Sequence, residues 1–379
     1  MKVFGITLFR ETLTLGFALL CMADPGSALD LAVPPTITEQ PQLNAIQPWN
    51  GMLVARADSY DETNAVWRFR YYHIDPSRGL APLTVGDCRT VQSVAETSQG
   101  VFALCGDAQK SVLMSLQKHM GSGWRQHDLP TELRGDEILA ASRRYLTLIS
   151  MDKISWLTSN GEWVKTTLMQ PPFELTGTVS PQYGLLTDSY LYLGYDQGEF
   201  GGALLAIPFN PDSTRPFGPS KQLSSMNVNA ILQDRSGKVW VTGGLAHMDS
   251  KWAEIAEVSN GKLTSLLREH PAESHRQFNG PLRLPKRSDI AGACVTPAGQ
   301  VLVVAPEVGV LAVSDKLTVV IAEQLRVFYH MPNYTVGSSP VGLLCPNENT
   351  ILIATRSTGV IEFTKTTGTG YTARQFISK

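Results

Sequence analysis

The sequence predicts an all-β protein, a seven-bladed β-propeller whose blades are four-stranded antiparallel sheets. Three observations support this fold: seven β-rich runs recur at nearly regular intervals, each run is flanked by similar strands and turns, and turn-forming residues are plentiful. The 379 residues include 32 Gly and 23 Pro, and 17% of them are charged. This composition favours short strands joined by turns over long helices.

Seven short apolar runs define the repeat. They are Met52–Val54, Val101–Ala103, Leu146–Leu148, Leu191–Leu193, Val239–Val241, Val301–Val303 and Ile351–Ile353. Successive runs start 49, 45, 45, 48, 62 and 50 residues apart, and a four-stranded blade needs roughly 40–50 residues. An insertion at about residues 268–289 explains the one long interval.

Each run has similar surroundings. A short strand and a polar turn precede it, as at Asp234–Gly237 before Val239 and at Pro297–Gly299 before Val301. A loop, a third strand and a second turn such as Ser259–Gly261 follow, and Asn-Gly in that turn is a strong hairpin signal. Because the central strands are apolar on both faces, stacking the sheets in a closed ring covers every face. Two unrelated β domains are the alternative.

One repeat carries a recognisable motif. At Asn229–Thr242 an apolar pair precedes Asp234, then come a turn and a strand containing Trp240. This segment resembles the propeller repeats of two-component-regulator sensor regions, and Gly309 and Gly359 keep one later position of the pattern in repeats six and seven. The resemblance implies a sensor-type propeller, although no transmembrane helix or kinase-like region follows it.

The N-terminus is typical of an export signal. Basic Lys2 and Arg10 come first, and Leu13–Ala23 then forms an apolar core that is too short to cross a bilayer. Small residues for cleavage follow at Gly26–Ala28. The expected domains are a signal peptide at residues 1–28, an N-terminal extension at 29–44 and the propeller at 45–379. We expect a periplasmic or secreted protein without a membrane span in the mature chain, and a buried N-terminal helix is the alternative.

Four cysteines remain after the expected signal peptide: Cys88, Cys105, Cys294 and Cys345. An even number in an oxidising compartment allows disulfides, and four cysteines permit three pairings. Proximity favours Cys88 with Cys105, whereas Cys294 and Cys345 occupy matching places in successive repeats. Buried free thiols are the alternative for each pair. No C-x-x-C motif supports thiol redox chemistry or a zinc knuckle.

Charge and motifs argue against several function classes. The formal net charge of −2 argues against a nucleic-acid-binding surface. The sequence has no G-x-S-x-G elbow, Walker loop, H-E-x-x-H motif or EF-hand pattern. His270 and His275, with Glu273 between them, lie in the insertion, where a solvated loop is favoured over a metal site.

The candidate site lies on one face, because the loops joining the second and third strands of all blades gather there around the channel. Asp58, Asp61, Asp107 and Asp152 belong to these loops, as do the six residues expected to bind a ligand: Asp196, Glu199, His247, Asp249, Glu307 and Arg356. This mainly acidic face suits a cation, a basic peptide or a hydroxyl-rich ligand. The segment Gly194–Gly202 contains four glycines, which let backbone approach a ligand. A glycine-rich hairpin with solvated polar residues is the alternative.

These features favour a non-enzymatic binding module that presents loop residues to a ligand or a protein partner. One alternative is a metal-dependent hydrolase or lyase on the same face, because Asp196, Glu199 and His247 suit a divalent metal or acid–base chemistry. Another is a periplasmic sensor or an envelope assembly subunit. A propeller hosts all of these roles, so the fold does not decide between them.

Overall fold

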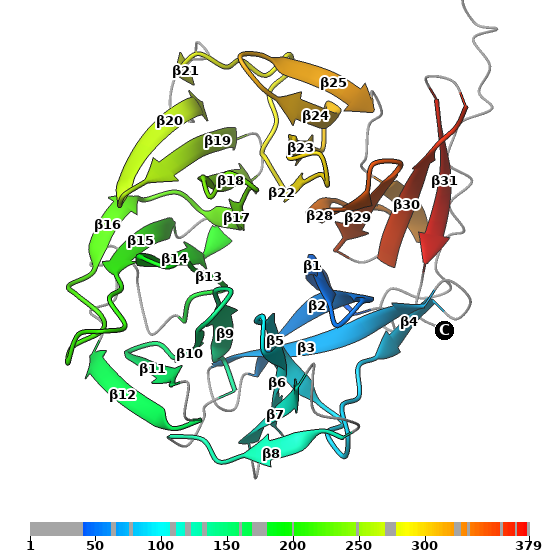
Figure 1. Cartoon of the computed structure of the whole chain (residues 1–379). Coiled ribbons are helices and arrows are strands. Elements are labelled where there is room, and N and C mark those ends of the chain that lie inside the picture. The colour runs from blue at the N-terminus through cyan, green and yellow to red at the C-terminus, as the bar shows by residue number, and fades with distance from the viewer. Residues whose placement is uncertain are drawn as a thin grey trace, which may run out of the picture. The chain divides into compact units, whose positions relative to one another are not determined.

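The computed structural model describes residues 41–61, 66–75, 79–106, 111–117, 123–130, 135–158, 161–168, 180–198, 201–247, 250–269, 278–321, 327–331, 334–356, 359–367 and 370–376. Within these residues, antiparallel sheets form seven blades around a central channel, without helices (Figure 1). The predicted seven-bladed β-propeller is confirmed. No helix in this described part of the chain has the length and hydropathy needed to cross a membrane.

The strands follow one another blade by blade. Blades one to four consist of β1 (Leu43–Trp49), β2 (Met52–Asp61), β3 (Val66–Asp75) and β4 (Gly79–Pro82); β5 (Val91–Glu96), β6 (Gly100–Gly106), β7 (Ser111–Gln117) and β8 (Arg125–His127); β9 (Ile138–Ala141), β10 (Leu146–Ile149), β11 (Lys153–Leu157) and β12 (Trp163–Leu168); β13 (Tyr183–Leu186), β14 (Tyr190–Asp196), β15 (Gly202–Pro208) and β16 (Lys221–Ser224). Blades five to seven consist of β17 (Val228–Gln233), β18 (Val239–His247), β19 (Ser250–Ser259) and β20 (Lys262–Glu269); β22 (Gly292–Val295), β23 (Val301–Ala305), β24 (Gly309–Val313) and β25 (Leu317–Ile321); β28 (Pro340–Asn347), β29 (Thr350–Thr355), β30 (Gly359–Lys365) and β31 (Tyr371–Phe376). The seven recurrent runs of the sequence all lie in the second strand of a blade.

Two short additions depart from the four-stranded pattern. Within the expected insertion, β21 (Phe278–Asn279) pairs with β20 and gives blade five a fifth strand. Between blades six and seven, β26 (Val327–Met331) and β27 (Tyr334–Ser338) pair as a separate hairpin. This hairpin was not expected, because the interval between the sixth and seventh runs is as short as that of an ordinary blade.

The ring closes through its inner strands, the first strand of each blade. Each inner strand contacts the next, and β28 of blade seven contacts β1 of blade one. Every blade is one continuous stretch of chain, so no strand is shared between the first blade and the last. The inner strands β22 and β28 approach each other closely. A Cβ on Gly292 would lie 2.9 Å from the Gly342 Cα on the neighbouring inner strand. A larger side chain at Gly292 would force the two strands apart.

A polar side chain stabilises the turn between the first and second strands in most blades. The Thr97 Oγ1 accepts hydrogen bonds from two turn amides in blade two, and the Ser142 and Thr187 hydroxyls do the same in blades three and four. In blade one the turn instead uses Asn50 and Gly51 at φ values of 51° and 70°. Both residue types tolerate this left-handed conformation.

The contacts of Asp234 and Trp240 explain why the sensor-like motif has an acidic residue and an aromatic residue at these two positions. The Asp234 carboxylate accepts hydrogen bonds from the Ser236 amide at 2.9 Å and the Lys238 amide at 3.1 Å. Its second oxygen accepts a bond of 2.9 Å from the Trp240 Nε1. The acidic residue therefore holds the turn, and the aromatic residue is its partner on the following strand.

The cores lie between neighbouring blades. One cluster combines Leu191, Leu205 and Phe209 of blade four with Ile149 and Trp156 of blade three. Comparable clusters join blades one and two, two and three, four and five, five and six, and seven and one. The sheets thus shield each other's apolar faces, as the repeat pattern predicts.

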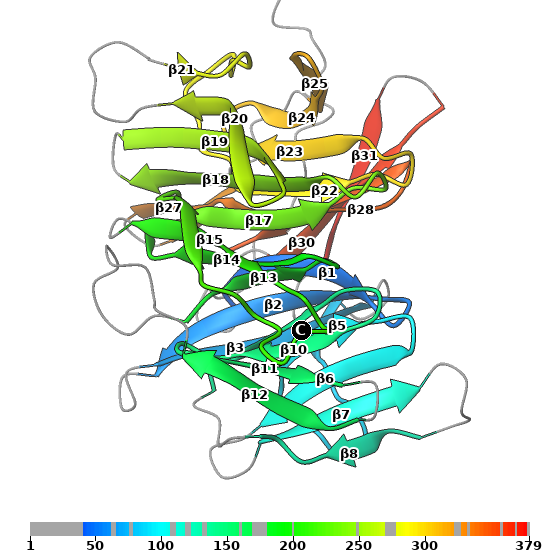
Figure 2. The ribbon, with the colours of Figure 1, turned by 60° about the vertical axis from the view of Figure 1, so that its left-hand side comes forward.

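The hairpin formed by β2 and β3 is long, as is the β18–β19 hairpin of blade five. Each of β2 and β3 has ten residues, and Figure 2 shows the two strands side by side. Phe69 of β3 belongs to the core between blades three and four, beyond the neighbouring blade two. Asp58 and Asp61, expected in a loop, lie within β2 instead. Aromatic residues alternating with arginines in Val66–Tyr71 extend the strand pairing past the expected loop.

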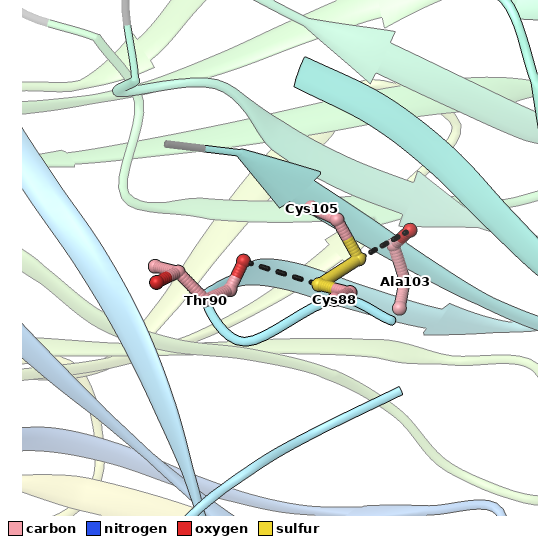
Figure 3. Close-up of a disulfide and its surroundings, with 4 residues drawn as sticks. All are labelled: Cys88, Thr90, Ala103 and Cys105. Atoms are coloured by element: carbon pink, nitrogen blue, oxygen red, sulfur yellow. Dashed lines mark hydrogen bonds between the residues drawn. A yellow bond between two sulfur atoms is a disulfide. The ribbon is translucent and has the colours of Figure 1, made fainter. Parts of the chain in front are cut away.

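Two disulfides are present. Cys88 pairs with Cys105 and Cys294 with Cys345, at Cα–Cα distances of 5.9 and 5.8 Å that suit the bond. The first joins the segment before β5 to β6, and the Thr90 carbonyl oxygen lies 3.3 Å from the Cys88 sulfur (Figure 3). The second links the inner strands of blades six and seven.

Candidate functional site

A cavity of about 260 Å³ lies in the channel and is lined by all seven inner strands. We call it the channel cavity. Aliphatic residues such as Ile46, Val94 and Leu139 are among its lining residues, although their side chains also belong to the cores between blades. Two lining residues come from other strands: Arg56 from β2 and Tyr71 from β3. An apolar cavity with a few convergent polar groups is the usual form of a small-molecule site.

Arg56 is buried and held from several sides, with 5% of its surface exposed. Its Nε donates a hydrogen bond of 2.9 Å to the Asn44 Oδ1 and lies 3.3 Å from the Asp58 Oδ1. Its Nη1 donates a bond of 2.6 Å to the Gln182 carbonyl of blade four. The guanidinium also lies 5.3 Å from the centre of the Tyr183 ring, within cation–π range. Arg56 thus ties blade one to blade four.

One donor of Arg56 stays without a partner. Its Nη2 is screened from solvent and makes no hydrogen bond within the described residues. Burial lowers the pKa of Arg56, but the charge of Asp58 and the Tyr71 and Tyr183 hydroxyls more than offset this, and the net shift is upward. Arg56 therefore remains a cation whose hydrogen-bonding capacity is incompletely used, which is costly in a buried position.

Asp58 lies beside Arg56, and Asp196 is close enough to Asp58 to influence its pKa. Burial raises the pKa of Asp58 to about 6, Arg56 and Arg356 lower it, and Asp196 raises it. Burial likewise raises the pKa of Asp196, against the opposing effects of the Gly198 amide and Arg356. We call Asp58 and Asp196 the rim carboxylates.

Backbone contacts fix Asp196 at the end of β14. The Gly198 amide donates a bond of 2.9 Å to the Asp196 Oδ1, and the Asp196 amide donates one of 2.8 Å to the Gln182 Oε1. Gly198 has a φ of 60°, so the turn after Asp196 needs a residue that tolerates the left-handed conformation. Gln182 contacts both Arg56 and Asp196, and it links the buried cation to the rim.

The structure brings some of the expected site residues together. Asp196 and Arg356 are close enough to influence each other and Asp58, from blades four, seven and one. Glu307 lies elsewhere on this side, where it pairs with Lys251 of blade five and its amide donates to the Ser288 hydroxyl.

The remaining expected residues lie partly or wholly outside the described part of the chain. Glu199, Asp249 and Asp107 are outside it, and for His247 it includes the backbone at the end of β18. His270, Glu273 and His275 are also outside. Among the residues that are described, no group of three or more His, Cys, Asp or Glu side chains is placed to hold a metal ion. The metal-site alternative stays a prediction.

The sequence patterns did not predict Arg56, Tyr71 or Tyr183 as site residues. The available signal was Arg56 itself, a charged residue in the otherwise apolar run Met52–Ala57. A charge within a central strand of a blade has no solvent to face, and such a position marks a site candidate. Tyr71 and Tyr183 give no comparable signal, because aromatic residues are common in strands.

Comparisons with known proteins identify the fold. No family model matches the sequence, and no curated protein matches it significantly. A candidate 6-phosphogluconolactonase from Bacteroides fragilis is similar in structure, with a TM-score of 0.50 and 10% identity over 91% of this chain and 97% of that one. Extracellular domains of two candidate hybrid two-component systems from B. thetaiotaomicron give TM-scores of 0.47 and 0.45 at 11% and 14% identity, covering 85% of this chain.

The chain spans 38% and 39% of the length of those two-component chains. Sensor-type propellers, which residues 229–242 resemble, are thus among its structural neighbours. At these identities the similarity shows the fold alone. The chain is a seven-bladed β-propeller.

Proposed function

We propose that this protein is an exported, non-enzymatic propeller that binds a small ligand in its channel cavity, with the rim carboxylates and Arg356 at the entrance. The observation that carries the proposal is the cavity of about 260 Å³, which is lined by all seven inner strands and by the buried Arg56. The volume is close to the lower end of known ligand pockets, so the ligand is small.

A purely structural role does not explain Arg56 well. Protein interiors are close-packed, and replacing a buried ion pair by apolar residues of similar size often leaves stability unchanged or increases it. Here a cation lies beside an open cavity, near two carboxylates that burial destabilises in their charged form. Buried charged groups with shifted pKa values, which cost the folded state stability, are common at binding sites.

Export is supported by two features. The chain has two disulfides, which form and persist mainly in oxidising compartments. The sequence at residues 1–28 has the basic start, apolar core and small residues of a signal peptide. The ligand would then be met in the periplasm or outside the cell.

The proposal is tested by measuring whether three small compounds bind to the protein and where on the protein they bind. Benzoate, benzyl alcohol and benzylammonium are titrated by calorimetry, and hydrogen–deuterium exchange is measured with and without each compound. The proposal predicts saturable binding of at least one compound, with protection in segments 44–48, 182–184, 229–232, 292–295 and 341–344. Protection confined to the outer strands, or no binding of any compound, would contradict a channel site.

A further inference from the structure

We infer that the hairpin formed by β26 and β27 is a lid at the entrance of the channel cavity. We call it the entrance hairpin. This inference rests on the proposed function only in taking the channel cavity as the ligand site, and it adds control of access to that site. Three features support it: the face on which the hairpin lies, the length of chain that carries it, and the contact that fixes its base.

The entrance hairpin lies on the same face of the ring as the candidate site. In blade six the outer strand β25 ends at Ile321, which pairs with Val310 close to the end of β23. In blade seven the inner strand β28 begins at Pro340, which pairs with Thr355 at the end of β29. The crossover between these blades therefore starts and finishes where second strands end, the face that carries Asp196 at the end of β14. Figure 2 shows β27 on the side of the ring at which β18 ends.

The chain between blades six and seven is longer than the connection requires. Residues 225–227 alone join the outer strand of blade four to the inner strand of blade five, whereas residues 322–339 make the same connection here. The surplus includes two strands of five residues, each about 17 Å long. Among the strands of the described chain, these two pair only with each other. The hairpin can therefore move without breaking a hydrogen bond between the strands of any blade.

The base of the entrance hairpin is fixed at the mouth of the cavity. The Ser339 carbonyl, directly after β27, accepts a hydrogen bond of 3.0 Å from the Arg356 amide. The Arg356 carbonyl in turn accepts one of 2.9 Å from the Leu43 amide of blade one. Val341, two residues beyond Ser339, lines the channel cavity. Residues 337–339 are Gly-Ser-Ser, a run of small residues that suits a hinge. Rotation at this hinge would carry the hairpin across the entrance while its base stays in place.

Access to the cavity is measured with a cysteine reporter near either end. Ala45→Cys is near the start of β1, on the entrance face, and Leu232→Cys is near the end of β17, on the opposite face. Both residues line the cavity and are partly exposed. The rate of alkylation by N-ethylmaleimide is compared between the full chain and a chain in which Gly-Ser-Gly replaces residues 327–338. A closed state that opens in about 10% of molecules or fewer predicts that Ala45→Cys reacts at least about tenfold faster without the hairpin, and that Leu232→Cys changes by less than about twofold.

Val336→Pro tests the same inference if the shortened chain does not fold. Val336 pairs with Tyr329 in the middle of the hairpin, and proline disrupts strand pairing. This variant should accelerate alkylation of Ala45→Cys and leave Leu232→Cys unchanged. Equal rates with and without the intact hairpin, or equal acceleration of both reporters, would overturn the lid. Neither result involves a ligand, so the proposed channel site is judged separately, by whether any of the three small compounds protects the inner strands.

Discussion

Asp234 and Asp58 are the same residue type in opposite situations. Burial tends to raise the pKa of Asp234, but hydrogen bonds from Ser236, Trp240 and Lys238 outweigh it and the net shift is downward. Burial dominates at Asp58, where Asp196 adds repulsion and the pKa rises to about 6. Donors placed around a carboxylate make it a structural element of the turn, whereas a carboxylate with few donors beside a cavity is poised for protonation.

Removing Arg56 should have the largest effect on stability. Arg56→Met leaves Asp58 buried near Asp196 without its nearest cation. We expect a loss of about 3 kcal/mol in the free energy of unfolding at pH 8, measured by urea denaturation. The loss should be smaller at pH 5, because Asp58 is then protonated, and Asp58→Asn in the same chain should restore part of it. Equal losses at both pH values would show that Asp58 is not the cause.

Asp58→Asn should stabilise the protein at pH 8. The pKa of Asp58 is raised in the folded state, so the folded protein binds more protons than the unfolded chain between about pH 4 and 6. The contribution of Asp58 to stability therefore falls as the pH rises through this window, by at most about 3 kcal/mol. The Asn variant should lose this part of the pH dependence in thermal melts. A variant that is less stable than the native protein at pH 8 would contradict the assignment.

Asp234→Ala should show the reverse pH dependence. The pKa of Asp234 is lowered on folding, so its contribution is present above its unfolded pKa and is lost as the pH falls through the folded one. We expect a loss of about 1 kcal/mol at pH 7 that becomes smaller as the pH falls below 4, from denaturant unfolding across this range. Ser236→Ala is a milder control, since it keeps the carboxylate. A loss that does not change at all as the pH falls would mean that Asp234 stabilises the turn without its charge.

Arg356→Gln should have the smallest effect. Arg356 is exposed and lowers the pKa of both rim carboxylates, so its removal should move the titration of Asp58 upward by less than about one pH unit. The shift is measurable as a displacement of the pH–stability profile, or by NMR titration of the Asp58 side chain. An unchanged profile would place Arg356 outside the entrance.

The fold was predictable because each repeat is marked by short-range sequence patterns. Each run, such as Val239–Val241, is a second strand of a blade, and each blade has a polar turn residue before it. Asp234 and Trp240 mark such a turn clearly enough to suggest the sensor-type repeat. These signals are short-range, so they survive without any knowledge of the ring.

The candidate site was predictable only in part. The loop rule assigned Asp196 and Arg356 to the same face, and the structure places both near Asp58. The rule could not reveal Arg56, because its contact with Gln182 spans 126 residues and depends on how blades one and four face the channel. The length of the β2–β3 hairpin was missed for a similar reason, since Phe69 is stabilised by packing against distant blades.

The junction of blades one and seven determines how a ligand in the channel cavity would affect closure of the ring. Successive blades are joined by the chain itself, and blades six and seven also by the Cys294–Cys345 disulfide. Blades one and seven have no such link, and the Leu43 amide donates to the Arg356 carbonyl across their seam. A ligand bound in the channel cavity, as proposed, would contact the inner strands on both sides of that seam. Ligand binding would then stabilise the closed ring, because the ring could not open at this seam without releasing the ligand.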